Sequence, residues 1–216
     1  MQTSTAPPTA AEAALPSNLF TRWLLYGLAA LAGGELVFAL ISGLLDNRGP
    51  VGDIGGHLIT LTALGATVYF AQRRALGLRG RWVPALVCGL ATFLSYALGY
   101  QVMGPPMDFL LSLVVLGIAT GVTLWLTLRG RIARPALCVA AVGVGYSVGA
   151  VAGAAAAVAF GDSVNQVFGG GLTGFMGVVG MIGVIAGVIG SLLSGLALTR
   201  VLGGVRSATP ASRGTW

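Results

Sequence analysis

Residues 54–81 read IGGHLITLTALGATVYFAQRRALGLRGR, an apolar run that ends in a cluster of arginines. The apolar part, residues 54–72, is close to the about 20 residues that a helix needs to cross a bilayer. Arginine concentrates in the cytoplasmic loops of membrane proteins, so the cluster also orients the run. This stretch predicts a membrane-spanning helix that ends on the cytoplasmic side. The arginines are Arg73, Arg74, Arg79 and Arg81.

The composition extends this interpretation to the whole chain. Hydrophobic residues make up 56% of the 216 residues and charged residues only 8%, against roughly 25% in an ordinary soluble domain. So few charges cannot cover a water-exposed surface, and lipid must therefore surround most of the chain. All basic residues are arginine, and Ala, Gly, Leu and Val are abundant, which predicts a bacterial genome rich in G and C.

Six apolar runs are long enough to span a bilayer. No segment shows the period-two alternation of a transmembrane strand. The expected fold class is therefore an all-α integral membrane protein, a bundle of six transmembrane helices. The runs are 19–45, 54–72, 82–102, 107–128, 135–160 and 172–202.

Charged residues segregate between the two ends of these runs. Every arginine except Arg48 lies near the start of the first run, at or after the end of the last run, or in the second or fourth connection. The opposite connections and their borders collect Asp46, Asp53, Asp108 and Asp162. By the positive-inside rule the arginine side is cytoplasmic. We therefore expect a multi-pass protein of the bacterial inner (plasma) membrane with both termini in the cytoplasm.

Three segments fall outside the regular spans. Residues 1–17 and 205–216 predict disordered cytoplasmic tails on either side of a transmembrane domain that covers 18–204. Within that domain, residues 163–174 are polar and rich in glycine. A straight helix through this segment and the last run would exceed the hydrocarbon thickness. We expect an external loop or a partly re-entrant segment there.

Two parts of the chain repeat one another at nearly constant spacing. Each contains Arg-Gly-Arg, Pro-Ala-Leu, a cysteine, a tyrosine and a glycine in the same order. A duplicated helical hairpin explains this, and internal repeats are common in transporters. Arginines followed by proline at a helix start are also favourable membrane chemistry in themselves, so both explanations stay open. The copies are 79–81, 84–86, Cys88, Tyr96 and Gly99, and 129–131, 135–137, Cys138, Tyr146 and Gly149.

Small residues recur at every fourth position in the last two runs. Such rows lie near one helix face and let two backbones approach closely, which drives helix association in lipid. We expect these rows to pack on a neighbouring helix or on another subunit. One row contains Gly145, Gly149, Gly153, Ala157 and Gly161, and the other Gly183, Gly187, Ser191 and Gly195.

Glu35 is the one acidic residue well inside a predicted span. An ionised carboxylate there costs at least a few kcal/mol, so Glu35 must face the bundle interior, be partnered or stay protonated. Gly33 and Gly34 beside it would let a ligand or another backbone come near. A role in solute or proton passage and a structural hydrogen bond are both compatible with this position.

His57 is the only histidine and lies one turn from Asp53, at the outer start of the second run. It suits a hydrogen-bonding residue at a helix end, and a pigment, haem or metal ligand is the alternative. With the acidic residues it defines a candidate solute or proton site. That site comprises Glu35, Asp53, His57, Asp108 and Asp162.

Other motifs argue against several function classes. Cys88 and Cys138 have no second cysteine nearby, so neither a redox pair nor a metal site is expected. Ser147 fits a G-x-S-x-G motif, but it lies within a predicted membrane helix and no histidine follows it. The glycines at 169–171 lack the lysine of a P-loop. We expect no enzymatic activity, no cofactor and, despite the net charge of +6, no nucleic-acid binding.

Two functions remain for a compact six-helix protein with short loops. The first is a small-solute transporter, or the membrane-embedded substrate-binding subunit of one. The alternative is a non-catalytic structural or accessory subunit of a larger respiratory or photosynthetic membrane complex. Both predict partners besides the bilayer, namely other membrane subunits, a second copy of the chain, or a small solute. A water-accessible cavity around Glu35 with the outer aspartates would favour transport, whereas a solid, dry bundle would favour the structural subunit.

Overall fold

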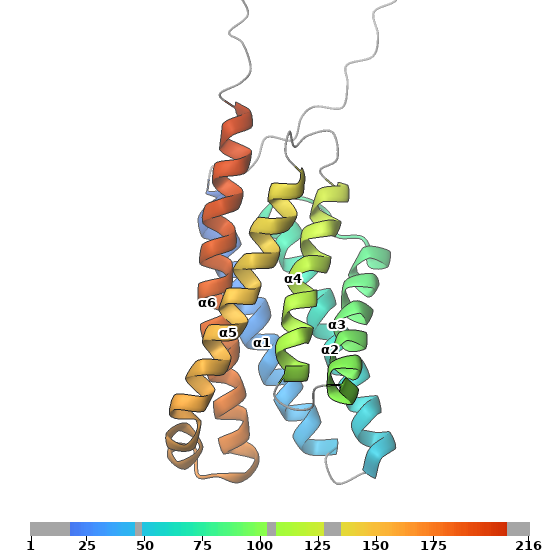
Figure 1. Ribbon diagram of the computed structural model, residues 1–216, viewed down its shortest axis with the longest axis vertical. Helices are drawn as coiled ribbons and strands as arrows, with labels where there is room; N and C mark the ends of the chain where they lie inside the picture. Colours follow the sequence, from blue (N-terminus) through green and yellow to red (C-terminus); the bar gives the residue numbers. More distant parts are fainter. Residues whose placement is uncertain (1–17, 46–48, 103–106, 128–134, 207–216) are drawn as a thin grey trace, which may run out of the picture.

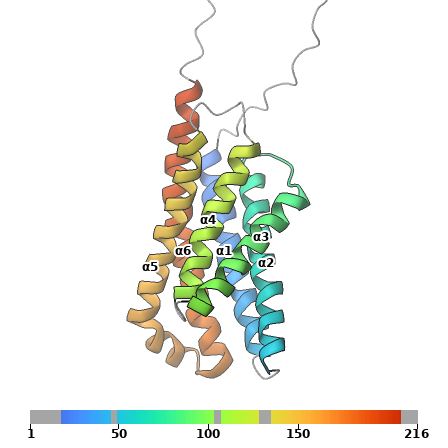
Figure 2. The ribbon, with the colours of Figure 1, turned by 45° about the vertical axis from the view of Figure 1, so that its right-hand side comes forward.

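The computed structural model describes residues 18–45, 49–102, 107–127 and 135–206, which form six helices (Figure 1). Each helix packs on the next along the chain, and α6 also packs on α1. The six helices therefore form a closed ring, with α5 and α6 on one side and α2 and α3 on the other (Figures 1 and 2). The helices are α1 (Leu19–Leu45), α2 (Gly49–Ala75), α3 (Trp82–Val102), α4 (Met107–Thr127), α5 (Pro135–Val167) and α6 (Gly171–Arg206).

Polarity is distributed in the opposite sense to that of a soluble protein. In the part of the chain that the structure describes, five helices are long and apolar enough to cross a membrane, and α4 contributes a shorter apolar stretch, Leu110–Leu126. Large apolar side chains are exposed, such as Ile59 at 63% and Val83 at 72%, whereas Thr120 and Ser194 are fully buried. Lipid solvates apolar surface, so this distribution is that of a helical membrane protein.

The second helix continues beyond the predicted end of its run. Arg73 and Arg74 lie in its last turn and not in a loop. Arg73 is buried, with its guanidinium carbon 5.6 Å from the centre of the Tyr69 ring, and Arg74 is exposed. Basic side chains at a helix C-terminus interact favourably with the helix dipole, which allows the helix to continue through them.

The prediction of a loop or re-entrant segment at 163–174 is wrong. Helix α5 continues through Val167, and only residues 168–170 separate it from α6. Gly169, Gly170 and Gly171 have positive φ angles of 82°, 73° and 55°, which side chains other than glycine rarely adopt. The Gly170 amide donates to the Asn165 carbonyl oxygen at 2.8 Å and so closes the end of α5. The segment is a tight helical hairpin.

Glycines bring α5, α6 and α1 into backbone contact. A Cβ atom added at Gly149 would stand 2.8 Å from the Gly190 nitrogen, and one at Gly153 would stand 2.9 Å from the Ile182 carbonyl oxygen. The row of small residues in α6 faces α1, since a Cβ atom at Gly187 would lie 3.2 Å from Leu28 Cα. Helix α6 thus presents one small-residue face to α5 and another to α1.

Three further glycines of the two rows also lie close to a neighbouring helix, whereas Gly161 does not. Gly145 lies against Ser194 of α6, and Gly183 and Gly195 lie against Glu35 and Trp23 of α1. Gly161 meets only Val178, at an ordinary contact distance of 3.8 Å.

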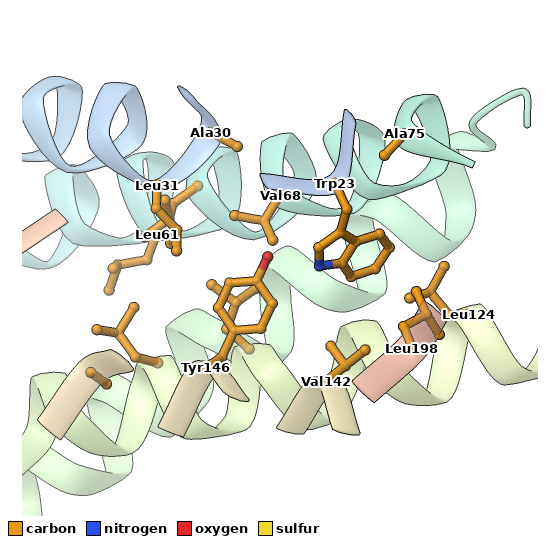
Figure 3. Close-up of a cluster of buried hydrophobic side chains, with 14 of the residues drawn as sticks. Trp23, Ala30, Leu31, Leu61, Val68, Ala75, Leu124, Val142, Tyr146 and Leu198 are labelled. Atoms are coloured by element: carbon orange, nitrogen blue, oxygen red, sulfur yellow. The ribbon is translucent and has the colours of Figure 1, made fainter. Parts of the chain in front are cut away.

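Large apolar side chains fill the centre of the ring. Trp23, Leu31, Leu61, Leu116 and Leu124 are each at most 1% exposed. In Figure 3 the Tyr146 ring points from α5 toward residues of the opposite wall, with its hydroxyl oxygen inside the cluster. The core therefore contains a few polar atoms on otherwise apolar packing.

Candidate solute-binding site

Glu35 lies on the face of α1 that packs against α6, and it is only 1% exposed. Gly183 makes room for it, because a Cβ atom added there would stand 2.7 Å from Glu35 Cγ. Neither carboxyl oxygen of Glu35 has a hydrogen-bond partner among the residues that the structure describes. Unpaired buried polar groups are rare, and an unpaired carboxylate is among the most costly. The buried carboxyl group of Glu35 is therefore a candidate functional group.

Hydrogen bonds join helices closer to the arginine end of the bundle. Trp23 Nε1 of α1 donates to Ser194 Oγ of α6 at 2.9 Å. Gln72 Nε2 of α2 donates to the Tyr146 hydroxyl oxygen of α5 at 2.9 Å, and so crosses the ring. Interhelical hydrogen bonds of this kind contribute about 0.6–2 kcal/mol each to helix association in membranes. They fix α1, α2, α5 and α6 on the arginine side of Glu35.

His57 belongs to an aromatic cluster at the opposite end. Its ring stacks on Tyr96 of α3, with the centroids 4.8 Å apart and the planes 9° from parallel. Phe38 of α1 meets His57 edge-on at 5.4 Å, and Tyr100 continues the stack from Tyr96 at 6.4 Å. Phe38 lies one turn beyond Glu35 on α1, so the structure brings the helix of Glu35 to His57.

A cavity of about 170 Å³ opens beside this cluster. It lies between α2 and α3, and polar atoms of His57, Tyr100 and Gln101 occur among its aromatic and aliphatic walls. Sites for drug-sized ligands measure roughly 300–1,000 Å³, so this cavity suits a smaller molecule. Aromatic faces with a few polar groups can hold a small planar or cationic solute.

The aspartates do not assemble with these residues where they can be placed. Asp162 lies exposed near the end of α5 and does not line the cavity beside His57. The side chains of Asp53 and Asp108 fall outside the described residues, as does the whole of Asp46. Glu35 does not line this cavity either. The described part of the candidate site is thus an aromatic cavity at His57, at the end of the bundle opposite the arginines, and a separate buried carboxyl group at Glu35.

Sequence reasoning missed the aromatic partners of His57. Tyr96 and Tyr100 lie four residues apart and so share one face of α3. That spacing, at the same end of the bundle as His57, was the available signal. Phe38 carried no signal, because one phenylalanine in an apolar run resembles any other lipid- or core-facing residue.

The two cysteines behave as small core residues. Cys88 and Cys138 are both buried, and Cys88 Sγ lies 3.7 Å from Thr123 Oγ1 of α4. Among the residues that can be placed, no three histidine, cysteine, aspartate or glutamate side chains gather as metal ligands would. The tyrosines of the apparent repeat also differ in surroundings, since Tyr146 lies in the core and Tyr96 in the aromatic cavity.

Comparison with known proteins places the chain in no family. No protein-family model, no curated protein sequence and no solved structure matches it.

Proposed function

We propose that this protein is a small-solute transporter, or the membrane-embedded substrate-binding subunit of one, and that Glu35 is its proton-binding group. The observation that carries this proposal is the burial of Glu35 with both carboxyl oxygens unpaired among the described residues. A charged carboxylate in that position is costly, so the neutral acid is favoured there at rest. A solute-driven movement of α1 that brings a cation or a polar group to this carboxyl group would supply a partner and favour proton release.

The aromatic cavity supports the same proposal. It offers a solute a binding place at His57, Tyr96 and Tyr100, and Phe38 connects that place to the helix that carries Glu35. A movement of α1 driven by the solute would therefore change the surroundings of Glu35. Proton-linked carriers use intramembrane acidic residues in this way.

The proposed orientation has the arginine end in the cytoplasm of a bacterial inner membrane. The placement of Arg22, Arg74, Arg79 and Arg200 at one end of the helices supports it. A cysteine introduced at Arg79 should be protected from a membrane-impermeant thiol reagent in intact cells. Labelling at that position from outside would reverse the orientation.

The function is tested with Glu35→Gln, Glu35→Leu and, as an exposed acidic control, Asp162→Asn. Purified protein is screened for thermal stabilisation by amino acids, sugars, organic cations and organic anions at two pH values. Solutes that stabilise it are then followed into proteoliposomes under an inward proton gradient. We expect Glu35→Gln to fold normally and to lose on the order of tenfold or more of the gradient-driven uptake, whereas Asp162→Asn keeps it.

The structural-subunit alternative gives a different pattern. If Glu35 only anchors α1 on α6, the Gln variant matches the wild type in every assay, and the Leu variant alone misfolds. A protein that no solute stabilises, and that co-purifies with large subunits from native membranes, would favour an accessory role in a complex.

A further inference from the structure

A larger cavity, of about 700 Å³, lies at the arginine end between α1, α2 and the turn that follows α2. Ala29 of α1 and Ala71 of α2 leave a trench between the two helices, and Phe70 and Leu78 contribute apolar walls. Arg74 and Arg79 line the same cavity, and both are exposed. An apolar trench therefore ends at two cationic side chains.

The turn after α2 positions Arg79. Gly77 has a φ angle of 73°, and the Leu78 amide donates to the Arg73 carbonyl oxygen at 2.9 Å, so the chain reverses directly at the helix end. Gly80 then lies against the Phe70 ring, where any side chain would collide. The turn thereby returns toward α2 and keeps Arg79 over the cavity.

The position of Arg74 is supported from α1. Arg22 donates from its guanidinium group to the Arg74 carbonyl oxygen at 2.8 Å, which satisfies a carbonyl at the exposed end of α2. This bond ties the two helices that form the trench at the level of the arginines. It also brings a third cation close to the cavity.

Trp82 marks the depth of this end in the bilayer. It is 73% exposed, at the start of α3, and meets Phe70 edge-on with the ring centroids 4.9 Å apart. Exposed tryptophan is enriched where lipid headgroups meet hydrocarbon. The arginines of the cavity therefore lie at headgroup level, and the trench extends from them along the hydrocarbon.

We propose that this cavity binds one anionic phospholipid, with its phosphate at Arg74 and Arg79 and the upper part of an acyl chain between α1 and α2. The charge and the apolar trench together fit this occupant, since a phosphate and an acyl chain are joined in a phospholipid. Basic pockets between transmembrane helices are known to bind the headgroups of anionic lipids. The site is separate from Glu35 and from the aromatic cavity, so it is independent of the proposed transport function.

The test uses purified full-length protein stripped of lipid in a neutral detergent. Binding of dioleoylphosphatidylglycerol, dioleoylphosphatidylcholine and glycerol 3-phosphate is measured by native mass spectrometry and by thermal stabilisation. The variants are Arg74→Gln/Arg79→Gln, which removes the cations, and Ala71→Leu, which fills the trench. Arg81→Gln is the matched control, because Arg81 is an exposed arginine two positions from Arg79 and does not line the cavity.

We expect the wild type to retain phosphatidylglycerol preferentially over phosphatidylcholine. An arginine at the membrane surface contributes roughly a fivefold factor to such binding, so the double variant should lose about 25-fold in affinity. Ala71→Leu should weaken phosphatidylglycerol binding while the protein stays folded, and Arg81→Gln should leave it unchanged. Equal losses in Arg81→Gln and the double variant would overturn the proposal in favour of general surface charge. Equal binding of both lipids, or full competition by glycerol 3-phosphate, would also overturn it.

Discussion

Helices α6 and α2 each lie between two neighbours in the ring, but they are packed in different ways. Helix α6 packs on Gly145, Gly149 and Gly153 of α5. It packs on α1 through its own glycines, Gly183, Gly187 and Gly195. Among the glycines of α2 whose contacts the structure describes, Gly65 makes a backbone-close crossing, where a Cβ atom would stand 2.7 Å from Gly89 Cα of α3. Cavities open on both sides of α2, toward α1 at one end and toward α3 at the other.

This contrast separates a rigid side of the molecule from a side that can admit ligands. Repeated backbone contacts fix the position of α6, because backbones cannot change rotamer to make room. The described glycines of α2 make fewer such contacts, and cavities lie at both ends of this helix. The Gln72–Tyr146 hydrogen bond is then the link between the two sides. A solute bound at His57 would act on the looser side.

The largest expected effect comes from an oversized side chain on the rigid side. Gly149→Leu should lower the free energy of unfolding by at least the about 1–3 kcal/mol typical of overpacking, because the added atoms meet the backbone of Ala186 and Gly190. Thermal unfolding in detergent measures this. Gly33→Leu is the control, since no atom lies within 4 Å of a Cβ at Gly33. If both variants melt at the wild-type temperature, α6 is not fixed in this way.

A much smaller effect is expected from the same kind of change beside α2. Ala97→Leu places new methyl groups at the wall of the aromatic cavity, so the free energy of unfolding should change by no more than about 0.5 kcal/mol. Stabilisation by a solute that binds the wild type should nevertheless be lost. A drop in stability as large as that of Gly149→Leu would mean that this wall has no room to spare, and the contrast between α2 and α6 would fail.

The sequence predicted the helices well where polarity changes abruptly. The runs 19–45 and 82–102 coincide with α1 and α3, because charged or turn-forming residues bound them on both sides. The end of α5 was predicted wrongly, because polar residues after Phe160 suggested that the helix stops. Polar residues indicate exposure to water, but they do not determine whether the backbone is helical. The backbone of α5 therefore stays helical through the polar residues at the exposed end of the hairpin.

The candidate site was predictable only in part. Glu35 and His57 stand out in any apolar sequence because burying an ionisable group is costly. Their surroundings depend on which helix faces come together, and the weak amphipathic pattern of a membrane helix does not determine this. The pairing of His57 with Tyr96, and of Glu35 with Gly183, therefore required the three-dimensional arrangement.

The turn of residues 168–170 has a consequence for the order in which the chain assembles. It joins α5 and α6 directly, so the contacts beside the turn are local in sequence, and local contacts form fast. The seam between α1 and α6 is the opposite case, since Trp23 and Ser194 lie 171 positions apart. We therefore expect the α5–α6 hairpin to form as one unit and the ring to close last at α1. Until that step Glu35 has no contact with Gly183 of α6. Its carboxyl group therefore becomes enclosed only when biosynthesis of the whole domain is complete.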